Sequence, residues 1–225
     1  MKVKEKLMLS TDGLEQFGPI TIVAFGDSIT HGVMNGYNDY ENVYWNRLRQ
    51  KLNAYRNFMP VNIIDAGIGG TTSTASLKRM EAQVFRHDPD LVIICFGLND
   101  VNYPLEDYLS SLKTIFASCK ARGVDAIFMS PNMLNTYVAD DTPAKFREYA
   151  FETAEMQRSG KMDKYIYAAM EVAKEMHIPV CDCYSKWKAL AETQDTTLLL
   201  CNRINHPTPE MHELFAQALY DMIMA

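Results

Sequence analysis

The sequence has few cysteines, no excess of positive charge and no long apolar run, and each absence excludes a class of protein. Its five cysteines are an odd number, and their spacing matches neither a zinc site nor a disulfide framework. The net charge of −6 offers no basic surface for nucleic acid. No stretch approaches the ~20 apolar residues of a membrane-spanning helix, and the N-terminus lacks the apolar core of a signal peptide. These absences predict a cytoplasmic protein with reduced thiols that neither binds nucleic acid nor inserts into a membrane.

Two cysteines, Cys181 and Cys183, lie close together in the chain, in an apolar stretch typical of a strand. Side chains alternate between the two faces of a strand, so we expect these thiols to point to opposite faces. The sequence therefore predicts buried, reduced thiols here and no metal site.

The 225 residues, 48% of them hydrophobic, suffice for one domain with a substantial core. Short apolar runs alternate with helical patterns, which predicts parallel strands joined by helical crossovers. The third run is apolar throughout, as expected of a strand covered on both faces. We therefore predict a single α/β domain over residues 1–225, a three-layer α/β/α sandwich with about five parallel strands. The predicted strands are Ile20–Phe25, Val61–Asp65, Leu91–Phe96, Ala126–Met129 and Pro179–Asp182.

Apolar residues at helical spacing predict helices between and after these strands. The clearest are Leu105–Cys119, Tyr165–Met176 and Leu214–Ile223. Residues 131–161 form an irregular segment rich in aromatic residues and methionine, and its part Ala144–Gln157 could be helical. We expect this segment to be an insertion that either packs on the body as a surface helical hairpin or forms a lid-like wall of a binding site.

One serine stands where α/β folds carry their chemistry. Residues 25–32 read Phe-Gly-Asp-Ser-Ile-Thr-His-Gly, directly after the first apolar run. Active sites of open α/β sheets lie at the carboxyl ends of strands, so this turn places the Ser28 hydroxyl at the rim of the sheet. Gly-Asp-Ser is also ordinary turn composition, and Ser28 could simply cap a helix.

A serine nucleophile needs a base that is held in place, and donors for the developing oxyanion. The second predicted strand is followed by the glycine-rich stretch Asp65–Ser73, and the third by Asn99, whose side chain carries an NH₂ group. His206 lies just before the last predicted helix, where Thr208 suits the N-cap and Pro209 the first helical position. The sequence therefore places a serine, a histidine and candidate donors at neighbouring turns.

These four blocks, in this order at successive strand ends, resemble the SGNH hydrolases, also called the GDSL esterase family. The resemblance runs from Phe25 to the C-terminal helix. It implies a flavodoxin-like fold and serine esterase chemistry on a small-molecule ester, without metal or cofactor. By this match Ser28 is the nucleophile and His206 the general base, and the oxyanion hole consists of the Ser28 and Gly70 N–H groups with the Asn99 side chain. Gly67 and Gly69 compete with Gly70 for that position.

Other polar residues near these blocks have simpler expected roles. Asp27 resembles the family's structural aspartate at the serine turn, and Asp100 is expected to be a cap or loop anchor. His31 shares a face with the serine if the following segment is helical, which would let it contact substrate. His87 and His212 are expected to be structural.

The chain departs from the family pattern at one position. The family commonly has an aspartate three residues before the histidine, and here that residue is Arg203. The serine and His206 could act as a dyad, with a backbone carbonyl or the Asn202 side-chain oxygen orienting the ring. Alternatively an aspartate from elsewhere in the chain, such as Asp182 or Asp195, could be the third catalytic residue. The protein could also have reduced catalytic activity or none.

The leading hypothesis is an esterase for short acyl groups such as acetyl, with acetylated carbohydrate as a plausible substrate class by resemblance alone. The alternatives are a lysophospholipase or thioesterase and a non-catalytic ligand-binding relative. A nucleotide or flavin site is disfavoured, because the loop Gly67–Ser73 has no lysine and does not match a P-loop. The sequence does not indicate an oligomeric state.

Overall fold

A computed structural model describes residues 2–56 and 59–225. Its centre is a five-stranded, all-parallel sheet in the order β2-β1-β3-β4-β5. β1 pairs with β2 and β3 on its two sides, and the three central strands are almost wholly buried. The predicted fold class is confirmed. The strands are β1 (Ile20–Gly26), β2 (Val61–Gly67), β3 (Leu91–Cys95), β4 (Asp125–Met129) and β5 (Val180–Cys181).

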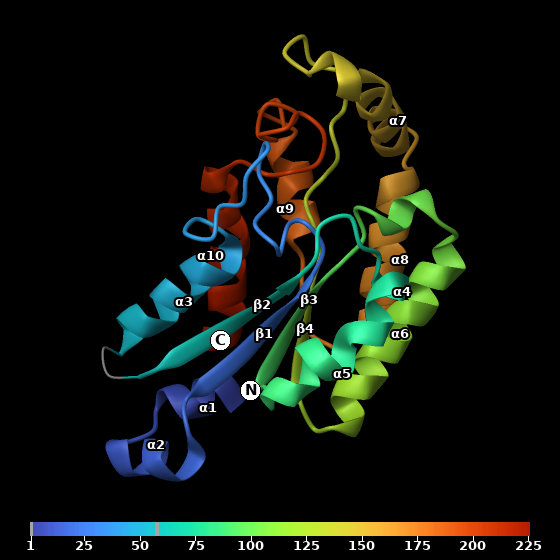
Figure 1. Cartoon of the computed structure of the whole chain (residues 1–225). Helices are drawn as coiled ribbons and strands as arrows, with labels where there is room; N and C mark the ends of the chain where they lie inside the picture. Colours follow the sequence, from blue (N-terminus) through green and yellow to red (C-terminus); the bar gives the residue numbers. More distant parts are fainter. Residues whose placement is uncertain (1, 57–58) are drawn as a thin grey trace.

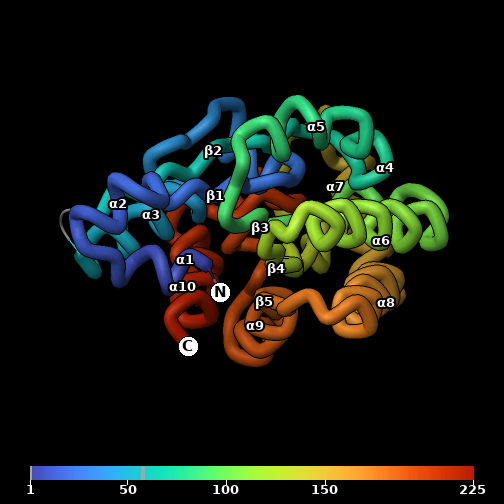
Figure 2. Tube along the Cα trace, turned by 90° about the horizontal axis from the view of Figure 1, so that it is seen from below, coloured from blue at the N-terminus to red at the C-terminus, as the bar shows by residue number. Residues whose placement is uncertain are grey.

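Helices cover both faces of this sheet (Figures 1 and 2). On one face α3 (Tyr44–Tyr55) packs against α10 (His212–Met224), with α9 (Cys183–Leu190) beside α10. On the other face α6 (Leu105–Ala121) packs against α8 (Lys161–Glu175). The remaining helices are α1 (Lys2–Leu7), α2 (Thr11–Phe17), α4 (Ser73–Ser76), α5 (Met80–Gln83) and α7 (Arg147–Arg158), with short 3₁₀ turns η1 (Leu77–Arg79), η2 (Phe85–His87), η3 (Asp100–Asn102), η4 (Ala144–Phe146) and η5 (Pro209–Met211).

The register of the sheet brings the ends of three strands to the same level. Gly26, the last residue of β1, lies opposite Gly67 of β2 and Cys95 of β3. The buried Arg79 holds two of these ends together, because its guanidinium donates to the carbonyl oxygens of Gly26 and Ala66. The turns that leave β1, β2 and β3 therefore start side by side, and nothing in the sequence pattern had marked Arg79 for this role.

The prediction for the two neighbouring cysteines is wrong in one respect. β5 ends at Cys181, and Cys183 already begins α9, so the chain turns between them. Their sulfur atoms lie 3.7 Å apart, both thiols are buried, and both are free. The expected alternation of faces fails because Asp182 leaves the strand to cap α9, its carboxylate accepting from the Ser185 N–H.

The segment 131–161 begins as a buried loop and continues as η4 and α7, which lies beyond the carboxyl ends of the strands (Figure 1). Its helix corresponds to the predicted Ala144–Gln157. α7 packs against α8, and the side chain of Asn135 donates to the Ala150 carbonyl, which ties the loop to α7. Among the described residues, no helix is long and apolar enough to cross a membrane.

Candidate active site

The turn after β1 holds Ser28 by its own hydrogen bonds. The Asp27 carboxylate accepts from the Ile29 N–H at 3.0 Å, and the Asp27 carbonyl accepts from the His31 N–H at 3.0 Å. The Ser28 carbonyl accepts from the Val33 N–H at 2.9 Å. Ser28 thus lies on an isolated helical turn, not at the start of a regular helix. Its hydroxyl is positioned by backbone bonds on both sides.

The ring of His206 lies between Ser28 and a backbone carbonyl. Its Nε2 atom is 3.1 Å from Ser28 Oγ, and its Nδ1 atom is 3.0 Å from the carbonyl oxygen of Met34. A carbonyl can only accept, so Nδ1 carries the proton and Nε2 is left to accept from the serine hydroxyl. Burial lowers the pKa of His206 below its usual value, which keeps the ring neutral at pH 7.

The Met34 carbonyl is fixed by a tight hairpin. The Met34 N–H donates to the Tyr37 carbonyl at 2.8 Å, and Val33 and Asn38 form an antiparallel bridge. Gly36 has a φ of 85°, which its missing side chain allows in such a turn. The Met34 carbonyl stands on this hairpin as the ring's acceptor, in the position that an acid would occupy.

Asn202, the predicted orienting residue, acts on the backbone of the His206 turn and not on its ring. Its Oδ1 atom accepts from three N–H groups, those of Ile204, Asn205 and His206, at 2.9 to 3.1 Å. This is an Asx-type turn that presets the loop before the histidine.

We expect Asn202→Ala to lower turnover by less than about a hundredfold, because the ring keeps its Met34 acceptor while the turn loses its anchor. Steady-state kinetics beside Ser28→Ala provide the measurement. A loss as deep as that of Ser28→Ala would contradict the dyad interpretation.

Neither aspartate considered as a third member contacts the ring. Asp182 caps α9, and Asp195 accepts from the Tyr137 hydroxyl at 2.6 Å. Arg203, at the position where the family commonly has its acid, has a φ of 60° and pairs with Asp141 at 2.9 Å. The side chain of Arg203 is engaged with the segment 131–161 and not with His206.

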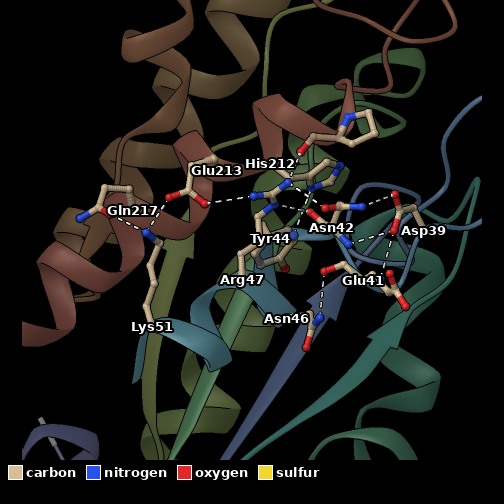
Figure 3. A network of polar contacts seen from close by, with 11 residues as sticks. Asp39, Glu41, Asn42, Tyr44, Asn46, Arg47, Lys51, His212, Glu213 and Gln217 are labelled. Atoms are coloured by element: carbon tan, nitrogen blue, oxygen red, sulfur yellow. Dashed lines mark hydrogen bonds and ion pairs between the residues drawn. The ribbon is translucent and has the colours of Figure 1, made fainter. Parts of the chain in front are cut away.

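The turn carrying His206 is tied to helices α3 and α10 by a polar network (Figure 3). The Arg47 side chain donates to the Pro209 carbonyl at 3.2 Å and to the Asn42 side chain at 2.9 Å. Glu213 accepts from both Arg47 and Lys51. This network holds the chain at Pro209, three residues after His206, against α3 and α10.

His212 is a structural residue of the same region. Its Nδ1 atom accepts from the Tyr44 N–H at 3.2 Å, and its ring stacks on that of Tyr44. Burial lowers the pKa of His212 to about 3. His87 is exposed in η2 and does not line the pocket beside Ser28.

The three glycines at the end of β2 and in the loop after it differ in the hydrogen bonds of their N–H groups. The Gly67 N–H donates to Asp65 at 2.8 Å, and the Gly69 N–H donates to His31 Nδ1 at 3.4 Å. The Gly70 N–H donates to no acceptor among the residues that the structure describes. Gly70 has a φ of 74°, in the left-handed region that glycine adopts readily. Of the three glycines, Gly70 is therefore the one whose N–H has no protein acceptor in the described part of the chain.

Asn99 points its amide at the same turns. Its Nδ2 atom donates to the Thr71 carbonyl at 3.1 Å and, at the longer distance of 3.3 Å, to Asp27. Burial raises the pKa of Asp27 to about 7, and the nearby Asp100 adds to the increase. Asp100 accepts from both the N–H and the hydroxyl of Ser73, which anchors α4 to η3 as expected of a loop anchor.

A pocket of about 450 Å³ opens in front of Ser28 and His206. Several residues that line this pocket could not be predicted from the sequence, because their residue types carry no functional signal and only the fold brings them to the site. No Asp, Glu, Lys or Arg lines it within the described part of the chain. No three His, Cys, Asp or Glu side chains meet as metal ligands would among residues 2–56 and 59–225. The missed lining residues are Val33, Asn35, Ile204 and Asn205, whereas Pro143, Phe146 and Tyr149 belong to the segment 131–161, for which a wall of a binding site was one of the two expectations.

Solved structures with the same fold include esterases. Axe2, an acetylxylan esterase from Geobacillus stearothermophilus, superposes with a TM-score of 0.70 at 22% identity, covering 91% of this chain and 94% of that one. The lipase/acylhydrolase from Enterococcus faecalis gives 0.70 at 24% identity, covering 91% and 95%. Two other solved forms of Axe2 are described as catalytic mutants, one of a serine and one of an aspartate.

A curated relative is the uncharacterized lipoprotein YqeF of Bacillus subtilis (strain 168), 25% identical over 96% of this chain and 94% of its own. The cytoplasmic location inferred from the sequence stays a prediction. The model of the GDSL-like lipase/acylhydrolase family matches residues 24–214, a span that includes every turn described above. The chain therefore belongs to the GDSL-like lipase/acylhydrolase family and is a carboxylic ester hydrolase.

Proposed function

We propose that the protein hydrolyses short-chain carboxylic esters through an acyl-enzyme on Ser28. The observation that carries this proposal is the 3.1 Å contact between Ser28 Oγ and the unprotonated Nε2 of His206. His206 takes the hydroxyl proton as Ser28 attacks the ester carbonyl, and returns it to the leaving alcohol. Water then cleaves the acyl group by the same steps in reverse order.

The free N–H groups support this mechanism. Those of Ser28 and Gly70 donate to no acceptor among the residues described, so both are available to the oxyanion. Asn99 joins them when its amide leaves the long contact with Asp27 for the developing charge. The proposed oxyanion hole thus comprises Ser28, Gly70 and Asn99.

The Met34 carbonyl lets a serine and a histidine work as a dyad. In the serine-protease triad, which is the established reference case, replacing the aspartate by asparagine costs about 10⁴ in rate through the wrong tautomer. Here the acceptor at Nδ1 enforces the correct tautomer without a carboxylate. A neutral carbonyl stabilises the imidazolium less than a charge does, so the dyad is weaker than a triad but competent. This argues against the non-catalytic alternative.

The pocket favours a small, uncharged substrate, and we propose an acetyl ester of a carbohydrate. The absence of a cationic side chain from the described lining disfavours lysophospholipids and coenzyme A thioesters, whose phosphates call for positive charge. Phe146 and Tyr149 offer aromatic surfaces suited to a sugar ring. The acetylxylan esterase with the same fold agrees with this substrate class.

The test is hydrolysis of p-nitrophenyl esters from acetate to decanoate by the native protein and by Ser28→Ala. We expect serine-dependent turnover that is fastest on acetate. Fastest turnover on long chains would replace the acetyl proposal with a lipid or thioester substrate. Absence of serine-dependent turnover at every length, on acetylated sugars as well, would contradict the proposed function.

A further inference from the structure

The amide orientations of Asn202 and Asn205 follow from their hydrogen bonds. Three N–H groups converge on one atom of the Asn202 amide, and only an oxygen can accept them. The other atom is therefore the nitrogen, and it donates to the Asn205 side chain at 2.8 Å. The Asn205 atom that receives this bond must be its oxygen. The Asn205 NH₂ group therefore points away from Asn202.

That NH₂ group has no partner in the described chain. The Asn205 N–H is bound to Asn202, and its carbonyl accepts from Asn132 at 2.9 Å, so the backbone of the residue is satisfied on both sides. Asn205 is only 7% exposed, lines the pocket and directly precedes His206. The side chain is thus held in one orientation, and its NH₂ group is a fixed donor available to a ligand in the pocket.

The place of Asn205 identifies the part of the substrate that it meets. The oxyanion donors stand on the turns after β1, β2 and β3, whereas Asn205 stands on the turn of His206. The protonated His206 must reach the leaving oxygen, so the alcohol lies against this turn. No Asp, Glu, Lys or Arg of the described chain lines the pocket there, which suits neutral hydroxyl or ether oxygens as acceptors.

We propose that Asn205 Nδ2 donates to an oxygen of the alcohol portion of the substrate and selects neutral, hydroxyl-bearing alcohols, with Asn202 holding it in orientation. This inference rests on the proposed esterase function. Asn205 is then a specificity-determining residue. The hydrogen bond between Asn202 and Asn205 serves to orient it, since the ring of His206 is already held by the Met34 carbonyl.

The experiment compares two acetates of three-carbon alcohols, glyceryl monoacetate and propyl acetate, which differ in hydroxyl groups. Asn205→Asp keeps the acceptor for Asn202 and removes the donor. We expect it to lower the ratio of kcat/KM for glyceryl monoacetate over propyl acetate by about five- to tenfold, mainly through KM, which is the effect of one lost hydrogen bond. Asn205→Ala should lower the ratio similarly, which separates loss of the donor from the added charge.

The matched control is Asn62→Asp, the same substitution on an exposed residue of β2 outside the pocket, which should leave the ratio as in the native protein. Thermal unfolding checks that each variant folds. An equal decrease on both acetates, with an unchanged ratio, would overturn the proposal and make Asn205 a support for His206 only. If the native protein hydrolyses neither acetate in a Ser28-dependent manner, the esterase proposal itself fails, a separate outcome.

Discussion

His206→Ala is expected to lower kcat on every ester by at least about a thousandfold, because the Ser28 hydroxyl then has no base. Its Nε2 atom is the ring nitrogen within 3.1 Å of Ser28 Oγ, and its tautomer is set by Met34. The two residues act as a unit, so the double variant Ser28→Ala/His206→Ala should be no slower than the slower single variant. Single-turnover kinetics on p-nitrophenyl acetate give the comparison.

His87→Ala is the matched control, since this histidine is exposed in η2 and does not line the pocket beside Ser28. It should keep the native kcat within about twofold, as expected of an exposed residue far from the chemistry. A decrease of less than about tenfold for His206→Ala would contradict the proposed mechanism, because another group would then be removing the serine proton.

Gly67→Ala is expected to lower the free energy of unfolding by about 3 kcal/mol and to reduce kcat by about a hundredfold. A Cβ atom at Gly67 would lie 2.3 Å from the His31 nitrogen and 2.7 Å from the Thr30 carbonyl carbon. Both are backbone atoms of the turn that holds Ser28. The turn must therefore move, which carries the nucleophile away from its base.

The readouts are the midpoint of thermal unfolding, expected to fall by roughly 6–12 °C, and kcat on p-nitrophenyl acetate. Gly69→Ala is the stability control, because a Cβ atom there would meet Val33 and Ser28 at ordinary contact distances of 3.6 and 3.8 Å. Equal stability of Gly67→Ala and Gly69→Ala would show that the turn yields without strain, contrary to the packing described.

The strands were predictable where burial decides the sequence pattern. Leu91–Cys95 is covered on both faces and reads as a continuous apolar run, and the prediction missed its end by one residue. β5 is shorter than predicted, because Asp182 leaves the strand to cap α9. α3 gave no signal at its start, since Val43 provides no capping side chain and the first turn holds no acid.

Ser28, His206 and Asn99 could be predicted because their chemistry lies in their side chains, and Gly70 because of its place in a glycine-rich turn after a strand. Ser28, His206, Gly70 and Asn99 all line the one pocket described above. Met34 could not be found by residue type, because every residue has a carbonyl. The dipeptide Asn35-Gly36 is a recognisable hairpin signal and could have indicated a turn at that place.

Arg203, which stands where the family commonly has an aspartate, has a structural role in the fold. Its guanidinium binds Asp141 and the carbonyls of Leu198 and Leu200, which joins the His206 turn to the segment 131–161. The ring of His206 meets the Met34 carbonyl at Nδ1, while Arg203 serves the packing of the two segments.

The most direct test of the central claim is covalent labelling of Ser28 by a p-nitrophenyl phosphonate, located by mass spectrometry of the digested protein. The proposed mechanism predicts one phosphonyl group on Ser28 in the native protein, none in Ser28→Ala, and labelling slowed by at least about a hundredfold in His206→Ala. Labelling of another residue, or equal labelling of Ser28 with and without His206, would contradict the claim that this pair forms the catalytic dyad.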